Sequence, residues 1–124
     1  MAKFYICGIC GNIVGLIKDK GGALSCCNTK MTYLEPNTVE ASQEKHLPDV
    51  TNIENGISVR VGSVLHPMTE EHYIDFIYVK TEHGGQRAVL AVGDSPEAKF
   101  SFVDDNPVEV YAYCNLHGLW KVEI

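Results

Sequence analysis

The stretch that decides the fold is His72-Tyr-Ile-Asp-Phe-Ile-Tyr-Val79, which alternates over eight residues. Successive side chains of a β-strand point to opposite faces of a sheet, so a period of two predicts a strand here. The same alternation places four side chains on one face: His72, Ile74, Phe76 and Tyr78. The protein is therefore expected to be mainly β.

Further β-type runs lie on both sides of this stretch, separated by Gly, Pro, Asn and Asp turn signals. Short strands at this spacing predict an antiparallel β-sandwich. The polar segment 37–55, with Pro48, is expected to be a linker followed by a long loop, and no amphipathic helix is predicted. The expected strands are Ile57–Val61, Arg87–Val92, Lys99–Val103, Val108–Cys114 and Leu119–Val122.

Residues 1–36 differ from the rest because they are rich in cysteine and glycine and contain only short apolar runs. This pattern predicts small hairpins around a metal. A domain of fewer than about 40 residues usually needs a metal, disulfides or a partner to be stable. The sequence therefore predicts two domains, residues 1–36 and residues 37–124.

The small domain contains a Cys7-Gly-Ile-Cys10 knuckle and an adjacent pair, Cys26-Cys27. Two residues between thiolates allow both sulfurs to reach one ion. Adjacent cysteines in a regular strand point to opposite sides, so the backbone must distort if both bind that ion. Disulfides or unligated thiols are the alternatives, and zinc and iron both suit four sulfurs.

The charge and hydropathy of the chain exclude several functions. The formal net charge is -6 and no basic block occurs, which disfavours nucleic-acid binding. No segment has the roughly 20 apolar residues of a membrane span. The first residues also lack the apolar run of a signal peptide. A cytoplasmic protein is expected, and there clustered cysteines are more often metal ligands than disulfides.

A second group of metal-ligand residue types is spread over residues 37–124. Each histidine taken singly is more simply a surface or hydrogen-bonded side chain, and His83, in a Gly-Gly turn, is expected to be one. The others occur as Glu44-Lys45-His46, His66 before Pro67, His72 at the start of a strand, and Cys114-Asn-Leu-His117.

Together, these residues resemble the active site of superoxide reductases. The Cys7-x-x-Cys10 knuckle with Cys26-Cys27 resembles the desulforedoxin module that precedes this site in desulfoferrodoxins. The resemblance covers nearly the whole chain. It implies a rubredoxin-like, desulforedoxin-type domain followed by an immunoglobulin-like β-sandwich, in a protein that is commonly a homodimer.

The resemblance also implies two iron ions per chain, the first held by the four cysteines of residues 1–36. The second would have an open sixth position in the ferrous state. It would reduce superoxide by one electron to hydrogen peroxide, and an external donor such as a rubredoxin would re-reduce it. The implied ligands of this second iron are His46, His66, His72 and His117 in a plane and Cys114 on the axis.

Two residues beside His46 are further candidates. Residues 37–124 carry a formal charge of -8, so an anionic substrate needs a local positive charge, which Lys45 can supply. Glu44 resembles the residue that binds the ferric metal after product release. Two other functions stay open: a zinc-stabilised β-domain without catalytic activity, and an electron carrier whose iron is closed to ligands.

Overall fold

The computed structural model describes all residues from Met1 to Ile124 and divides them into two compact units, Met1–Glu35 and Pro36–Ile124. Unit 1 is built from very short strands in two small antiparallel sheets, of order β2-β1-β5 and β3-β4. Its strands are β1 (Phe4–Ile6), β2 (Ile13–Gly15), β3 (Ser25–Cys26), β4 (Thr29–Lys30) and β5 (Thr32–Tyr33).

Unit 1 has few buried apolar side chains. Only Phe4, Cys7 and Met31 are buried among its residues. Since burial of apolar surface is the main stabilising term in folding, so small a core makes this unit dependent on an additional cross-link.

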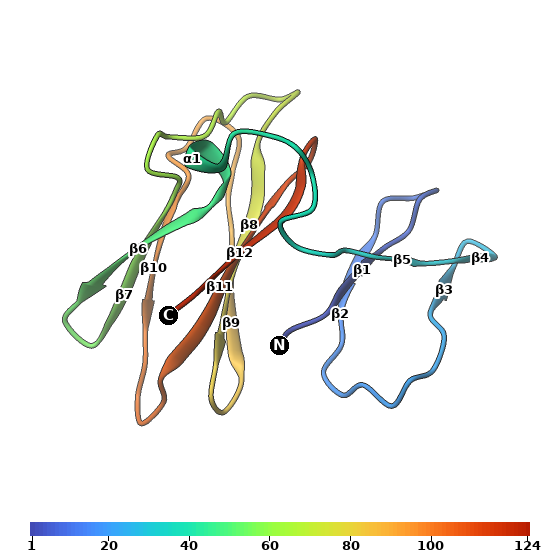
Figure 1. Ribbon diagram of the computed structural model, residues 1–124, viewed down its shortest axis with the longest axis horizontal. Coiled ribbons are helices and arrows are strands. Elements are labelled where there is room, and N and C mark those ends of the chain that lie inside the picture. The colour runs from blue at the N-terminus through green and yellow to red at the C-terminus, as the bar shows by residue number, and fades with distance from the viewer. The chain divides into compact units, whose positions relative to one another are not determined.

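Unit 2 is a β-sandwich of a three-stranded and a four-stranded antiparallel sheet, as predicted (Figure 1). The first sheet has the order β10-β7-β6 and the second the order β12-β11-β8-β9. The strands are β6 (Pro48–Ile53), β7 (Gly56–Val61), β8 (Ile74–Thr81), β9 (Gly85–Val89), β10 (Glu97–Ser101), β11 (Pro107–Cys114) and β12 (Gly118–Glu123).

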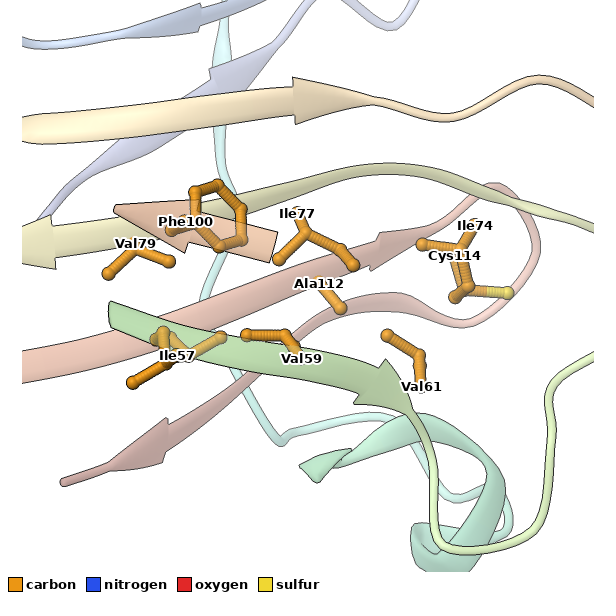
Figure 2. Packing of buried hydrophobic residues seen from close by; sticks show 10 residues of the cluster. Ile57, Val59, Val61, Ile74, Ile77, Val79, Phe100, Ala112 and Cys114 are labelled. Carbon is orange, nitrogen blue, oxygen red and sulfur yellow. The ribbon is translucent and has the colours of Figure 1, made fainter. Parts of the chain in front are cut away.

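The apolar core of unit 2 fills the space between its two sheets. Every second residue of β7 contributes to it, from Ile57 to Val61, as alternation along a strand requires. Figure 2 shows this row facing side chains of β8 and β11, with Ile74 and Cys114 side by side at one end. The core thus brings Cys114 to the end of the sandwich where the histidines are found.

A β-bulge in β8 corrects the predicted alternation. Tyr113 pairs with Phe76, and the next residue of β11, Cys114, pairs with Ile74, so Asp75 is the extra residue. Ile74 consequently lies in the core, whereas the Phe76 ring stacks on Tyr113 on the other side of the sheet. The prediction that Ile74 and Phe76 share a face is therefore wrong. The predicted start of the strand at His72 is also wrong, because β8 begins at Ile74.

The segment predicted to be a linker and long loop contains two regular elements. A single helical turn, α1 (Gln43–His46), is followed directly by strand β6. Gly62 fixes the position of α1, because a Cβ atom at residue 62 would overlap the carbonyl oxygen of Glu44. The expectation of a loop across this whole segment is therefore wrong. No helix in the structure has the length and apolar character needed to cross a membrane.

Candidate metal centres

The four cysteines of unit 1 form one compact group. All four sulfur atoms lie within 4.8 Å of one another, with Cys10 and Cys26 3.6 Å apart and Cys26 and Cys27 3.9 Å apart. A tetrahedron with metal–sulfur bonds of about 2.3 Å has sulfur–sulfur edges of about 3.8 Å. A disulfide would require about 2.0 Å, and all of these thiols are free.

Backbone geometry explains how adjacent cysteines reach the same group. Cys27 and Asn28 both adopt left-handed conformations, with φ of 53° and 57°. Such φ values are uncommon for residues other than glycine, and they turn the Cys27 side chain toward the side of Cys26. The expected distortion of the backbone is thus present at this pair.

Hydrogen bonds shift the pKa values of the thiols in this group in opposite directions. Backbone N–H groups of Cys10 and Ile9 donate to the Cys7 sulfur and lower the pKa of Cys7 to about 6. Neighbouring thiols, Cys10 first, raise the pKa of Cys26 to about 12. Amide donors therefore favour a thiolate at Cys7, while four close thiolates repel one another unless a cation lies between them.

The histidines of unit 2 form a square. Neighbouring ring centroids are 4.5 to 5.0 Å apart, and neighbouring planes are inclined by 77° to 88°. The diagonal from His46 to His72 is longer, at 6.3 Å, and its planes are inclined by only 32°. The order around the square is His46, His66, His72 and His117.

Hydrogen bonds on the outside of the square fix which nitrogens point inward. His46 Nδ1 lies 2.6 Å from the Ser42 carbonyl and His66 Nδ1 lies 2.7 Å from the Pro67 carbonyl. A carbonyl only accepts, so both Nδ1 atoms carry the proton and both Nε2 atoms expose a lone pair. Those two Nε2 atoms are 3.2 Å apart, an arrangement that calls for a cation between them.

The other two histidines complete the same arrangement. His117 directs Nδ1 inward, 3.1 Å from His46 Nε2. His72 Nε2 is buried without a hydrogen-bond partner, which is costly for a polar atom. Metal–nitrogen bonds of about 2.1 Å at the corners of a square give neighbouring nitrogens about 3.0 Å apart, so the spacing fits a metal ion.

Cys114 brings a sulfur to this square from the apolar core. It is fully buried, and its ligand atom lies within 4.8 Å of those of His46, His72 and His117. Burial raises the pKa of the Cys114 thiol, and backbone N–H groups of His117 and Leu116 partly oppose that rise. Four nitrogens in a square with a fifth donor differ from the tetrahedral arrangement of structural zinc.

Burial also sets the charge of the histidines. It is the first cause of the lowered pKa values of His46 and His72, and it lowers the pKa of His66 to about 4. These three imidazoles are therefore neutral near pH 7, the form in which nitrogen can bind a metal. His83, by contrast, is exposed and contacts Asp105, as the sequence predicted.

The two charged residues of α1 are placed differently relative to this group. The Lys45 charge helps to lower the pKa of both His46 and His72, so it acts on two members of the square. The Glu44 carboxylate is not part of the group. Glu44 lines a hollow together with Ser42, Gln43, Leu47, Pro48, Asp49, Ser63 and Val122.

Two further residues, Trp120 and Asn115, hold this site together and were not predicted from the sequence. Trp120 donates its indole N–H to the His117 carbonyl and stacks on His46. Asn115 accepts from Tyr73 N–H and donates to the Glu71 carbonyl, which clamps the peptides on either side of His72. The signal for Asn115 was its position between Cys114 and His117, whereas that for Trp120 was only its closeness to His117.

The fold and the two groups define a small β metalloprotein with one all-sulfur and one histidine–cysteine centre. Residues 38–123 match the desulfoferrodoxin family, and residues 1–34 match the desulfoferrodoxin N-terminal domain. The chain therefore belongs to the desulfoferrodoxin family. Its four-cysteine and histidine–cysteine groups are those expected of a desulfoferrodoxin with two iron sites.

Individual relatives agree with this assignment. The chain is 45% identical to a desulfoferrodoxin of Syntrophotalea carbinolica, over 98% of this chain and 95% of that protein. Its structure is similar to the superoxide reductase from Treponema pallidum, with a TM-score of 0.85, 35% identity and 99% of each chain covered. A one-iron superoxide reductase from Giardia intestinalis matches 65% of this chain at 32% identity and covers 99% of its own length, with a TM-score of 0.54. These relatives support an oxidoreductase role.

Proposed function

We propose that this protein is a superoxide reductase, which adds one electron and two protons to superoxide and releases hydrogen peroxide. The observation that carries the proposal is the square of inward-facing nitrogens with the buried Cys114 sulfur beside it. Iron held there by His46, His66, His72, His117 and Cys114 would supply the electron and an open coordination position. The four cysteines of unit 1 would hold the other iron.

The chain's own residues account for binding at this site. Cys114 lies in the core cluster, so its sulfur reaches the group from the protein interior. His72 and His117 are only half-buried, so we propose that a small molecule approaches the group from their side. Lys45 supplies positive charge beside His46 and His72, within a unit of formal charge -8. It would attract anionic superoxide and could donate a hydrogen bond to it.

Cys114 and Glu44 would both favour reduction of superoxide over its oxidation. The Cys114 thiolate would stabilise the oxidised form of a metal. The four histidines are neutral donors, so only the thiolate would reduce the positive charge of the site. The Glu44 carboxylate lies outside the group, so a change in its side-chain conformation would be needed for it to reach the group. We propose that it does so only after product leaves.

The reaction consumes electrons, so the proposal includes an external one-electron donor such as a rubredoxin. We also propose a homodimer in the cytoplasm, in keeping with reduced, metal-binding cysteines. These parts of the proposal rest on the family resemblance and on the cysteine chemistry.

Pulsed superoxide added to the reduced protein tests the reaction type. We expect one hydrogen peroxide per oxidised histidine–cysteine site, no dioxygen from that step, and a need for donor in sustained turnover. Sustained removal of superoxide without donor, with equal amounts of dioxygen and peroxide, would show a dismutase instead. Metal analysis with a visible spectrum distinguishes iron from zinc, and azide binding distinguishes an open site from a closed electron carrier.

A further inference from the structure

A methionine lies in the segment that joins two corners of the histidine square. This segment, residues 66–72, begins at His66 and ends at His72, and we call it the ligand loop. Its third residue, Met68, is half-buried and packs against the apolar core of unit 2. The backbone N–H of Ile74 donates a hydrogen bond to the Met68 sulfur, at 3.3 Å. A thioether therefore ties the ligand loop to the first residue of β8.

This contact lies beside the strand position that carries the sulfur ligand. Ile74 is the cross-strand partner of Cys114, and Figure 2 shows their side chains next to each other. The Met68 carbonyl also accepts a hydrogen bond from Gly93 N–H, at 2.9 Å. Met68 is thus held by its sulfur and by its carbonyl, in the loop that presents two of the histidines.

The other two methionines of the chain have no such position. Met1 is 62% exposed at the N-terminus, and Met31 is 6% exposed in the small core of unit 1. Methionine commonly fills gaps in apolar cores, which accounts for Met31. Filling a gap does not account for the hydrogen bond from Ile74 to the Met68 sulfur, because a thioether is only a weak acceptor.

From these observations we propose that Met68 is a modification site, at which hydrogen peroxide oxidises the thioether to a sulfoxide and thereby weakens metal binding by the histidine–cysteine group. The O–O bond of peroxide breaks, and one oxygen becomes bonded to the sulfur, which gives up two electrons. The proton of that oxygen passes to the other oxygen, which leaves as water. No further reactant is needed. The inference rests on the proposed function for the source of the peroxide, which would be formed at the neighbouring histidine square.

Oxidation changes the properties on which the Met68 contact depends. A sulfoxide is polar and carries an additional oxygen, whereas the Met68 side chain packs against apolar residues. Burying a polar group without a hydrogen-bond partner is costly, so the oxidised side chain should leave the core and release Ile74 N–H. The ligand loop would then hold His66 and His72 less firmly. Methionine sulfoxide reductases reverse this oxidation, so the change in metal binding is reversible as well.

Reagent hydrogen peroxide added to the oxidised, iron-loaded full chain tests the proposal. Mass spectrometry of peptides measures the sulfoxide fraction at each methionine, and visible spectra follow the release of each iron to a chelator. We expect Met68 to be oxidised before Met31. Iron of the histidine–cysteine site should then be released about tenfold faster, the size of effect typical of groups that orient metal ligands. Iron of the four-cysteine site should be released at an unchanged rate, and treatment with methionine sulfoxide reductase should restore the slow release.

Two variants serve as controls. Met68→Leu keeps a side chain of similar volume but has no sulfur to oxidise, so its rate of iron release should not respond to peroxide. Met31→Leu removes a methionine from unit 1 and should respond as the unmodified protein does. Circular dichroism and iron content before treatment verify that both variants are folded and loaded.

Three results would overturn the proposal. One is oxidation of Met68 no faster than that of Met31, and another is an unchanged rate of iron release once Met68 is oxidised. The third is an equal response to peroxide in Met68→Leu and the unmodified protein, which would place the damage at another group such as Cys114. Peroxide is supplied as a reagent, so each result is independent of superoxide. A protein that made no peroxide from superoxide would contradict the proposed function and leave these results in force.

Discussion

The indole ring of Trp120 stacks on the imidazole of His46, with ring centroids 4.9 Å apart and planes inclined by 27°. The same indole donates its N–H to the carbonyl oxygen of His117, at 3.1 Å. One buried side chain of β12 therefore supports two neighbouring corners of the histidine square. These two histidines, His46 and His117, are 71 residues apart in the sequence.

The Trp120 contacts can be separated by two substitutions. Trp120→Phe keeps an aromatic ring against His46 and removes the N–H donor, so it should cost about 1 kcal/mol of stability. Trp120→Ala removes the ring as well and should cost about 3 to 5 kcal/mol. Chemical denaturation and iron content of the histidine–cysteine site measure these effects. Equal losses in the two variants would show that the stacking contributes nothing.

The Asn115 clamp predicts a second pair of variants. Asn115→Ala removes the acceptor for Tyr73 N–H and the donor to the Glu71 carbonyl, so it should cost about 1 to 3 kcal/mol. Asn115→Asp retains the acceptor and should lose less. Because the clamp lies on both sides of His72, iron affinity of that site should fall in the same order. If iron affinity is unchanged in Asn115→Ala, the clamp does not position His72.

The division of ligands between the two units predicts independent metal sites. Cys10→Ser should remove the iron of the four-cysteine group and leave superoxide reduction largely intact. Cys114→Ser is the matched variant in unit 2 and should have the opposite effect, with loss of most activity and of the ferric-thiolate absorption of that site. Metal analysis and visible spectra of both variants decide the matter. Loss of both irons in a folded Cys10→Ser protein would contradict the division.

The charge beside the histidine square predicts a dependence on ionic strength. Lys45→Ala should slow the bimolecular reaction with superoxide at low salt and flatten its dependence on ionic strength, because steering is screened over about 8 Å at physiological salt. Lys99→Ala, on strand β10, removes an equal charge as a control. Pulse radiolysis provides both rates. An identical low-salt rate in Lys45→Ala and the unmodified protein would exclude steering by this residue.

A half-buried ion pair elsewhere in unit 2, Lys121 with Glu109, predicts a dependence of stability on pH. Burial raises the pKa of Glu109, but hydrogen bonds from Tyr111 and Lys121 outweigh it, so the net shift is downward. A lowered folded-state pKa stabilises the protein above the ordinary value of 4.5, and this contribution is lost as the pH falls through the folded-state pKa.

Glu109→Gln should therefore destabilise the protein by about 1 kcal/mol at pH 7. The difference in unfolding free energy from the unmodified protein should shrink below pH 4.5, the ordinary value for a glutamate. Urea denaturation of both proteins across this range measures it. A difference that stays constant down to pH 3 would show that the charge of Glu109 is not involved.

Much of the fold could be predicted from the sequence because the strands of unit 2 alternate clearly and turn residues separate them. The bulge at Asp75 could not, since Ile74 and Phe76 are both apolar and the alternation continues through them. Helix α1 also escaped prediction, because a single turn is too short to show a helical period. Its position depends on close backbone approach at Gly62, which no local pattern reveals.

The candidate site was predictable as a set of ligand types, but its geometry was not. Residue spacing could not show which nitrogen of each histidine points inward. That choice depends on carbonyl groups such as those of Ser42 and Pro67, which lie outside the motifs. Nor could spacing reveal Trp120 as a support, because its contact with His46 joins residues far apart in the chain.

The two metal-binding groups also differ in how much chain must be made before each can form. The four cysteines lie within residues 7–27, so a newly synthesised chain has every ligand of that group early. The histidine square needs His117, which follows His46 by 71 residues, and therefore the strands of both sheets. Domains generally fold in order from the N-terminus during synthesis. Metal should accordingly be acquired in two successive steps, and brief iron starvation would yield chains loaded at the cysteines alone.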